Sequence, residues 1–375
     1  MKLLNLTFAT SILSASLLMA CSSGNGDKEV VRFDLAGASR TEQFNNLKIK
    51  DFKYVALDTV SKALLGERAM IQGIAGDTVI ISDDLERVLL FTLSDGKLIR
   101  EINHKGQGPG EYSWLDHIYV DRPAKEMVLN TPYNFAHRYT FSDSLVSTYN
   151  YDTPSTMRLS TGSLSKGINM YEQRESGFVI HQFDKNFQQT DSIVIDGYKL
   201  GYRSGSFSNL GDEGIITIVD TLYTIKPGKL EKLAILDRNG KTITPEIEEE
   251  LDQMIGSDFE GMMKKQNEYI NLLGWFASDN DKMEVIYQSE GTSFFDFFRM
   301  NDGKLLAHIQ LTDNGADKKG LPVEYEGSTL YLNPIFCQDG IWYAVIPENA
   351  TIEAEKDADD VICNAAIASF RLEEE

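Results

Sequence analysis

The chain has 375 residues and a formal net charge of −21, from 36 Lys and Arg against 57 Asp and Glu. So negative a chain is a poor partner for nucleic acid or for an anionic lipid surface. Its hydrophobic content of 42%, with 10% aromatic residues, excludes a disordered protein and is that of a folded globular one.

The chain begins with a secretion signal. Lys2 is followed by a long apolar run that ends in small residues before a cysteine. The segment from Leu18 to Cys21 resembles the lipobox of bacterial lipoproteins, in which cleavage leaves the cysteine as the new N-terminus with diacylglycerol on its thiol. An ordinary signal peptide that ends in Cys is the alternative.

These features predict the domain organisation. We expect a signal peptide over residues 1–20, a lipidated Cys21 with a flexible polar tether to residue 29, and one domain over residues 30–375. No later segment has the run of about twenty apolar residues that a membrane helix needs. Acyl chains contribute about 0.8 kcal/mol per buried CH₂, so the lipid on Cys21 would hold the protein on a membrane.

Five segments share a pattern of an apolar alternating run, a short polar turn and a second alternating run, which predicts five β-hairpins. Their turns lie near Gly96, Ser144, Asn186, Gly240 and Gly303. Further strand pairs, such as IAGDTVIISD before the first hairpin, bring each period to about four strands. Four short strands in about 40 to 50 residues are typical of a β-propeller blade.

The two ends of the chain supply a sixth unit. Residues 328–346 provide two strands and residues 362–372 a third. An N-terminal strand, VVRFDL or FKYVAL, has to complete this blade, because an open ring leaves a strand edge unpaired. We therefore predict an all-β fold, a six-bladed β-propeller of four-stranded antiparallel blades. Seven blades are the main alternative, and a two-sheet sandwich explains the period less well.

One repeat carries a resemblance to a known family. The segment KGQGPGEYSWLDHIYVDRPAKEMVLN, residues 105–130, resembles an NHL-type propeller repeat in its Gly-rich turn, its aromatic Tyr112, and its inner strand ending at Asp121. Together with the lipobox, the mature chain resembles the six-bladed propeller lipoproteins of Bacteroidetes-type bacteria, an NHL-like or TolB-like family. The other five units lack the glycines.

The Gly-rich stretch itself predicts a corner between blades. Its glycines fall at 106, 108 and 110 between two strands, which matches neither a P-loop nor a dinucleotide fingerprint. Glycine tolerates positive φ and Pro109 fixes its own φ, so this loop can turn the chain sharply from one blade to the next. We expect Glu111 to cap backbone N–H groups and Tyr112 to wedge between blades.

Blade topology then sorts the loops by face. We expect the tight turns at Asp95-Gly96, Asn239-Gly240 and Asp302-Gly303 to follow third strands and to bind nothing. The opposite face collects the crossovers between blades and the turn from Asn130 to His137, and we place the ligand there. The candidate residues are Gly106, Gly108, Pro109, Gly110, Glu111, Tyr112, His117, Asn130, Tyr133 and His137.

The longest crossover, residues 244–274, is helical by pattern. Pro245 stands at a first-turn position, with acidic residues near the start and Lys264 and Lys265 further on. Ile247 and Leu251 belong to one apolar face. The insertion either packs on the rim of the propeller, or serves as a lid over the channel or as a docking face.

Catalytic and metal-binding patterns are scarce. The five histidines lack zinc-site spacing, and no Gly-x-Ser-x-Gly nucleophile motif occurs. We predict no metal and no cofactor; a calcium ion held by Asn130, His117, Glu111 and His137 stays an alternative. Cys337 and Cys363 either form a disulfide in an oxidising compartment or are two free thiols.

Two function classes follow. The favoured one is a non-catalytic binding or scaffold propeller for a glycan, peptide or envelope protein, anchored through Cys21. The alternative is a divalent-cation-dependent hydrolase or lyase acting on a sugar, lactone or ester. An envelope-assembly role by analogy with TolB rests on the fold alone. The resembling surface-exposed lipoproteins carry an acidic cluster after the cysteine. Here residues 22–26 are neutral, which favours the periplasmic face of the outer membrane over the cell surface.

Overall fold

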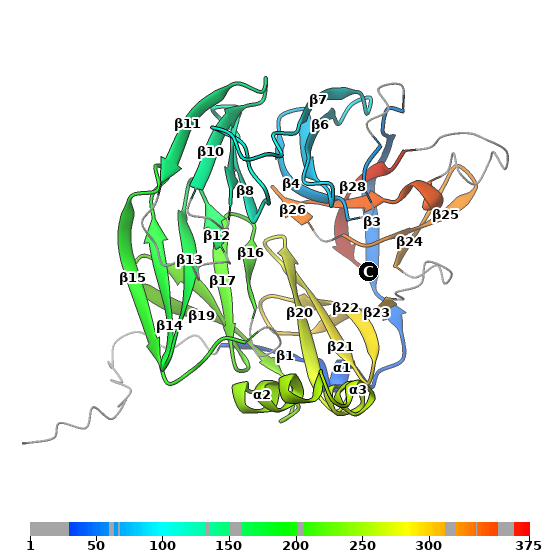
Figure 1. Cartoon of the computed structure of the whole chain (residues 1–375). Coiled ribbons are helices and arrows are strands. Elements are labelled where there is room, and N and C mark those ends of the chain that lie inside the picture. Colours follow the sequence, from blue (N-terminus) through cyan, green and yellow to red (C-terminus); the bar gives the residue numbers. More distant parts are fainter. Residues whose placement is uncertain are drawn as a thin grey trace, which may run out of the picture.

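The structure is a computed structural model that describes residues 30–59, 64–66, 68–131, 135–150, 160–201, 206–311, 320–334, 336–351 and 364–375. Six sheets stand around a central channel, each with an antiparallel four-stranded meander whose first strand is innermost (Figure 1). The predicted six-bladed β-propeller of four-stranded blades is therefore confirmed.

The first three blades are consecutive four-stranded meanders. Blade 1 contains β4 (Met70–Ala75), β5 (Thr78–Ser82), β6 (Val88–Thr92) and β7 (Leu98–Ile102); blade 2 contains β8 (His117–Asp121), β9 (Glu126–Asn130), β10 (Phe135–Thr140) and β11 (Leu145–Asn150); blade 3 contains β12 (Ser160–Ser163), β13 (Gly167–Arg174), β14 (Gly177–Phe183) and β15 (Gln189–Asp196).

The last three blades take strands from the N-terminal part of the chain, which supplies a fifth strand to blades 4 and 5 and the fourth strand to blade 6. Blade 4 contains β16 (Phe207–Leu210), β17 (Glu213–Ile218), β18 (Thr221–Lys226), β19 (Lys229–Asp237) and the outer β1 (Val31–Asp34); blade 5 contains β20 (Ile270–Ser278), β21 (Lys282–Ser289), β22 (Thr292–Arg299), β23 (Leu305–Leu311) and the outer β2 (Phe44–Asn45); blade 6 contains β26 (Phe336–Gln338), β27 (Ile341–Ile346), β28 (Ala366–Glu374) and β3 (Leu47–Ala56).

Ring closure follows one of the two predicted routes. The FKYVAL segment lies in β3, which pairs antiparallel with β28 from Ala56↔Ala366 to Leu47↔Glu374. The other segment, VVRFDL, contributes β1, which runs parallel to β19 on the outside of blade 4. A hairpin of β24 (Leu321–Tyr325) and β25 (Ser328–Leu332) leads from blade 5 to blade 6 and forms its own two-stranded sheet. Part of the predicted sixth unit, residues 328–332, therefore stands outside the blade.

Packing between blades explains the strand patterns. A central strand lies between two neighbouring blades, so both of its faces are apolar, as in β6, where Val88 to Phe91 are buried without a break. An outer strand faces solvent on one side, and in β15 only Ile193 and Ile195 are half-buried while the other residues are exposed. Between blades 5 and 6, Phe297 meets Trp342 edge to face.

One of the five predicted hairpins is wrong. The turns near Gly96, Ser144, Asn186 and Gly303 do join third and fourth strands. Asn239 and Gly240 instead follow β19, which is the fourth strand of blade 4. Both residues have the positive φ of a hairpin turn, 48° and 76°. The chain beyond them does not fold back, because Thr242 forms a parallel bridge with Ile270 of the next blade.

The helical insertion is shorter than predicted. It contains α2 (Pro245–Met254), capped by Thr244, and α3 (Phe259–Gln266), capped by Asp258; residues 270–274 already belong to β20. Leu251 and Met262 form a small core of their own, and both helices lie at the outer edge of the ring (Figure 1). No described residue of α2 or α3 lines the channel, which agrees with the rim interpretation. A short α1 (Leu35–Ala38) and the 3₁₀ turn η1 (Glu348–Ala350) complete the described elements.

Candidate functional site

The central channel has a volume of about 1570 Å³. The inner strands β4, β8, β12, β16, β20 and β26 all contribute to its wall. Each inner strand begins at the face that carries the crossovers and ends at the turn to its second strand. The channel therefore has a crossover mouth and an opposite turn end, and the two are lined by different residues.

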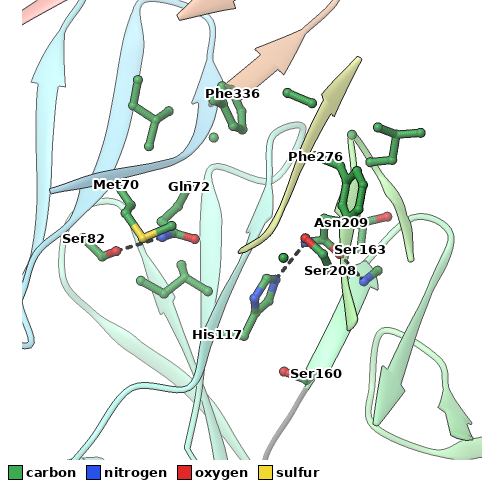
Figure 2. A pocket seen from close by; sticks show the side chains of 18 of the residues that line it. Met70, Gln72, Ser82, His117, Ser160, Ser163, Ser208, Asn209, Phe276 and Phe336 are labelled. Carbon is green, nitrogen blue, oxygen red and sulfur yellow. Dashed lines mark hydrogen bonds between the residues drawn. The ribbon is translucent and has the colours of Figure 1, made fainter. Parts of the chain in front are cut away.

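The middle of the channel is polar but uncharged. Figure 2 shows Gln72, His117 and Asn209 directed into one shared space, although they come from blades 1, 2 and 4. Gln72 Nε2 donates to Ser82 Oγ at 2.8 Å. Apolar and aromatic side chains alternate with these amides and hydroxyls around the same space, namely Met70, Phe276 and Phe336 (Figure 2).

A hydrogen bond across the channel fixes the state of His117. Asn209 Oδ1 accepts from the backbone N–H of Gly162 at 2.6 Å, so the other end of its amide is the NH₂ group. That group lies 3.3 Å from His117 Nε2, which must accept. The imidazole is then neutral with its proton on Nδ1. Burial agrees, because it lowers the pKa of His117 to about 4.

The neighbouring residue, Asp116, lies half-buried in the channel wall. Its Oδ2 accepts from Ser160 Oγ at 2.9 Å and from Asn130 Nδ2 at 3.3 Å. Desolvation outweighs these hydrogen bonds and raises the pKa of Asp116 to about 6. Adjacent residues on one strand end therefore have pKa values displaced in opposite directions by the same cause, burial.

The turn end of the channel carries charged groups that lie close to one another. Arg122 Nη1 donates to Asp339 Oδ2 at 2.8 Å, and Arg122 Nη2 lies 4.0 Å from Asp212 Oδ2. Asp279 accepts from Trp342 Nε1 at 3.0 Å and lies 3.5 Å from Lys282 Nζ. The charges at this end are thus largely paired with one another.

The Gly-rich loop, the centre of the sequence prediction, does not reach the channel. Glu111 Oε2 accepts from the N–H of Gly108 at 2.7 Å, which is the predicted capping role. Tyr112 is buried between blades 1 and 2 and donates to the carbonyl of Glu86 at 2.8 Å, which is the predicted wedge. Gly110, with φ of 80°, accepts from Tyr139 Oη. Residues Gly106, Gly108, Pro109, Gly110, Glu111 and Tyr112 therefore form a structural corner, and none of them lines the channel.

The remaining candidates take different places, although His117 and Asn130 are opposite each other on β8 and β9. His117 lines the channel. Asn130 stands behind the wall, on Asp116. His137 lies inside blade 2, with Nδ1 3.0 Å from Thr148 Oγ1. Tyr133 is outside the described residues. The four candidate calcium ligands are thus not brought together, and among the described residues no group of three or more His, Cys, Asp or Glu side chains could hold a metal ion.

The cysteine prediction stays open. Cys337 is buried on the channel wall, and burial raises the pKa of its thiol to about 12. Cys363 lies outside the described residues, so a bond between them is not tested. Over the described part of the chain, no helix is both long enough and apolar enough to cross a membrane.

Sequence reasoning missed most of the channel wall. Each blade supplies only a few residues to it, so Asp116, Asn209 and Arg122 stand in no common motif. Their shared signal is positional: Asp116 precedes an inner strand, and Arg122 and Asp212 follow one at the first turn of a blade. An alignment of the blades by strand register, rather than a search for motifs, could have found them.

Comparisons with known proteins agree on the fold. No curated protein matches the chain. A crystal structure of a protein named as an exported protein, from Bacteroides fragilis NCTC 9343, is similar with a TM-score of 0.64 and 14% identity, covering 92% of this chain and 98% of that one. A member of the DUF4221 family from Bacteroides vulgatus gives a TM-score of 0.50 and 12% identity, covering 88% and 99%.

A further match is too distant to bear on function. It is a catalytically inactive virginiamycin B lyase from Staphylococcus aureus, with a TM-score of 0.42 and 12% identity over 85% of this chain and 99% of that one. The family described as Domain of unknown function (DUF4934) matches residues 30–361, which is most of the chain, and the protein therefore belongs to that family.

Proposed function

We propose that the protein is a non-catalytic binding module of the cell envelope that holds a glycan in its central channel. The observation that carries this proposal is the lining of the channel middle, where amides, hydroxyls and a neutral imidazole alternate with aromatic rings. Sugar hydroxyls need both donors and acceptors, and the apolar faces of sugar rings pack on aromatic side chains.

The size and the charge of the channel support the same class of ligand. Its volume of about 1570 Å³ exceeds the ~300–1,000 Å³ of ordinary small-molecule pockets, so a chain of several sugars has room. The charged residues at the turn end are paired with one another. At the crossover mouth the indole of Trp114 is 61% exposed and offers a surface on which a sugar ring can stack.

The proposed location rests on the sequence. A lipidated Cys21 would anchor the propeller to the outer membrane, on the periplasmic face in preference to the cell surface. The likeness to a Bacteroides protein named as exported supports a place outside the cytoplasm. The NHL-like character of residues 105–130 and the NHL-like or TolB-like character of the mature chain are also predictions from the sequence, as is the absence of nucleic acid among the partners.

Two other ligand classes remain outcomes of the test. A peptide could use the same amides through its backbone, and an envelope protein could dock on the crossover face. The alternative of a cation-dependent hydrolase or lyase is favoured by no specific arrangement among the described residues.

Thermal unfolding of the mature chain from Ser22 tests the proposal against neutral oligosaccharides, peptides and lactones, with calcium or EDTA in parallel. A specific ligand at one hundred times its dissociation constant adds about 2.7 kcal/mol. We expect an oligosaccharide to raise the midpoint, and Trp114→Ala and Gln72→Ala to remove that rise. Asn301→Ala, on an exposed outer turn, is the control. A rise with peptides alone, or a midpoint set by calcium, would overturn the glycan proposal.

A further inference from the structure

The contacts of Arg122 join three blades that alternate around the ring. Arg122 lies in the turn between β8 and β9 of blade 2, Asp339 in the turn between β26 and β27 of blade 6, and Asp212 in the turn between β16 and β17 of blade 4. An ion pair between adjacent blades would run along the rim. Each of these contacts skips a blade, so the guanidinium stands over the end of the channel itself.

The two turns hold their carboxylates in defined places. Asp339 and Gly340 have φ of 54° and 72°, the left-handed pair of a tight hairpin turn. Gly211, with φ of 59°, precedes Asp212. Because a carboxylate lies on either side of Arg122, the guanidinium remains over the opening whether it favours one partner or the other.

The crossover mouth is built differently. Its described residues include Arg68, Asp84 and Trp114 from the loops of blades 1 and 2, and Asp84 and Trp114 are exposed. Among the described residues, no ion pair reaches across this mouth between blades. Over the described part of the chain, the two ends of the channel therefore differ in their ion pairs across the opening.

We propose that Arg122, held by Asp339 and Asp212, closes the turn end and makes the channel a blind pocket that is entered at the crossover mouth. A chain cannot thread through a blind pocket, so the site takes a glycan by its end. The closure stands on geometry alone, whereas the choice of a glycan end rests on the proposed function.

The chain contains a reporter for this closure. Cys337 lines the channel two residues before Asp339, and its side chain is buried. In the mature chain from Ser22 with Cys363→Ser, it is the single cysteine. The test is the rate at which a small neutral thiosulfonate modifies Cys337 in the wild type and in Arg122→Met, which replaces the guanidinium by a flexible, uncharged and shorter side chain. Arg100→Met, on the exposed outer strand of blade 1, is the control.

We expect modification of Cys337 to be about fivefold faster in Arg122→Met and unchanged in Arg100→Met. An exposed ion pair stabilises the closed end by ~1 kcal/mol, and the loss of that amount raises the population of the open end about fivefold. High salt should raise the wild-type rate towards that of Arg122→Met. Removal of a nearby cation raises the thiol pKa and lowers the thiolate fraction, so an acceleration reports access and not reactivity. An unchanged rate in Arg122→Met, at an unchanged thermal midpoint, overturns the closure.

A second measurement separates the closure from the glycan. Maltoheptaose has two ends, whereas β-cyclodextrin contains the same sugars in a ring without ends. Protection of Cys337 by the linear sugar and not by the ring supports recognition of chain ends, and equal protection by both contradicts it. If Cys337 is modified faster in Arg122→Met and yet is protected by no member of the oligosaccharide panel, that result supports the blind pocket and contradicts the proposal that it binds a glycan.

Discussion

The amide of Asn209 joins three blades: its Oδ1 accepts from Gly162 N–H of blade 3 at 2.6 Å, and its Nδ2 lies 3.3 Å from His117 Nε2 of blade 2. Asn209→Ala leaves the Gly162 N–H without this acceptor, which costs about 1–3 kcal/mol. We expect that loss in the free energy of unfolding measured with urea. Asn301→Ala, on an exposed outer turn, should change it by less than about 0.5 kcal/mol. Equal effects of the two substitutions would mean that the amide does not hold the blades together.

The opposite pKa displacements of His117 and Asp116 predict opposite dependences of stability on pH. The folded state keeps His117 neutral, with a pKa of about 4. The contribution of this residue therefore lowers the free energy of unfolding as the pH falls from 6.5 to 4. The pKa of Asp116 is about 6 in the folded state and 3.8 in the unfolded chain. Its contribution therefore lowers the free energy of unfolding as the pH rises from about 4 to 6. The two effects partly cancel in the wild type.

Substitution of one residue at a time should separate the pH effects of His117 and Asp116. Relative to wild type, Asp116→Asn should gain stability as the pH rises from 4 to 6, and His117→Gln should gain it as the pH falls from 6.5 to 4. Differences between variant and wild-type curves remove the titration of all other groups. The measurement is urea unfolding at half-unit steps of pH, and parallel difference curves for the two variants would refute the assignment.

The corner at Gly110 makes a prediction about packing. Gly110 and Gly76 both have positive φ, 80° and 62°, so alanine at either position costs about 1–2 kcal/mol of backbone strain. A Cβ on Gly110 would lie 2.9 Å from Leu145 Cδ2 and 3.3 Å from Tyr139 Oη, whereas one on Gly76 meets nothing within 4 Å. Gly110→Ala should therefore lower the thermal midpoint more than Gly76→Ala. A smaller effect at Gly110 would mean that Leu145 and Tyr139 move to accommodate the added methyl group at little cost.

The same corner shows how far the sequence could lead. Glycines, proline and an aromatic residue within a few positions form a local pattern, and local patterns predicted the corner, the capping Glu111 and the wedge Tyr112. The Asn239-Gly240 pattern is equally local and misled, because the buried Arg238 donates to the carbonyls of Val219 and Ile270 and directs the chain towards the next blade. An Asn-Gly pair can lie in a hairpin or in a crossover between blades, and the contacts that decide between the two come from residues distant in sequence.

The channel could not be found in this way. Its wall takes a few residues from each of six strands. The pairing of Arg122 with Asp339 joins positions 217 residues apart. No spacing rule connects such residues until the blade register is known. The period of strands predicted the ring, and hence the existence of a channel, but not its chemistry.

The buried carboxyl group of Glu284 lowers the stability of the fold. Its side chain is 1% exposed between blades 5 and 6, Oε1 has no hydrogen-bond partner among the described residues, and burial raises its pKa well above the ordinary value. The wild type therefore loses stability as the pH rises above about 4.5, because the unfolded chain ionises this group and the folded one does not. Glu284→Gln removes that loss.

We expect the thermal midpoint of Glu284→Gln to exceed that of the wild type at pH 8 and the difference to shrink towards pH 4. Glu268→Gln, at an exposed position after α3, removes one carboxylate from the same blade and should show no such trend. A difference that does not change with pH would indicate that Glu284 ionises in the folded protein.

Closure of the ring by β3 gives the last prediction. β3 covers the edge of β28 along residues 47–56, whereas β1 and β2 only add outer strands to blades 4 and 5. Phe33 of β1 stacks on Phe298 with ring centroids 4.9 Å apart, so a chain that starts at Asn46 loses that contact but keeps the closed ring. It should unfold cooperatively at a lower midpoint than a chain that starts at Val30. A chain that starts at Asp58 exposes the whole edge of β28 and should aggregate on gel filtration. A monomeric, cooperatively unfolding chain from Asp58 would show that the ring is held by packing between blades and not by its last pair of strands.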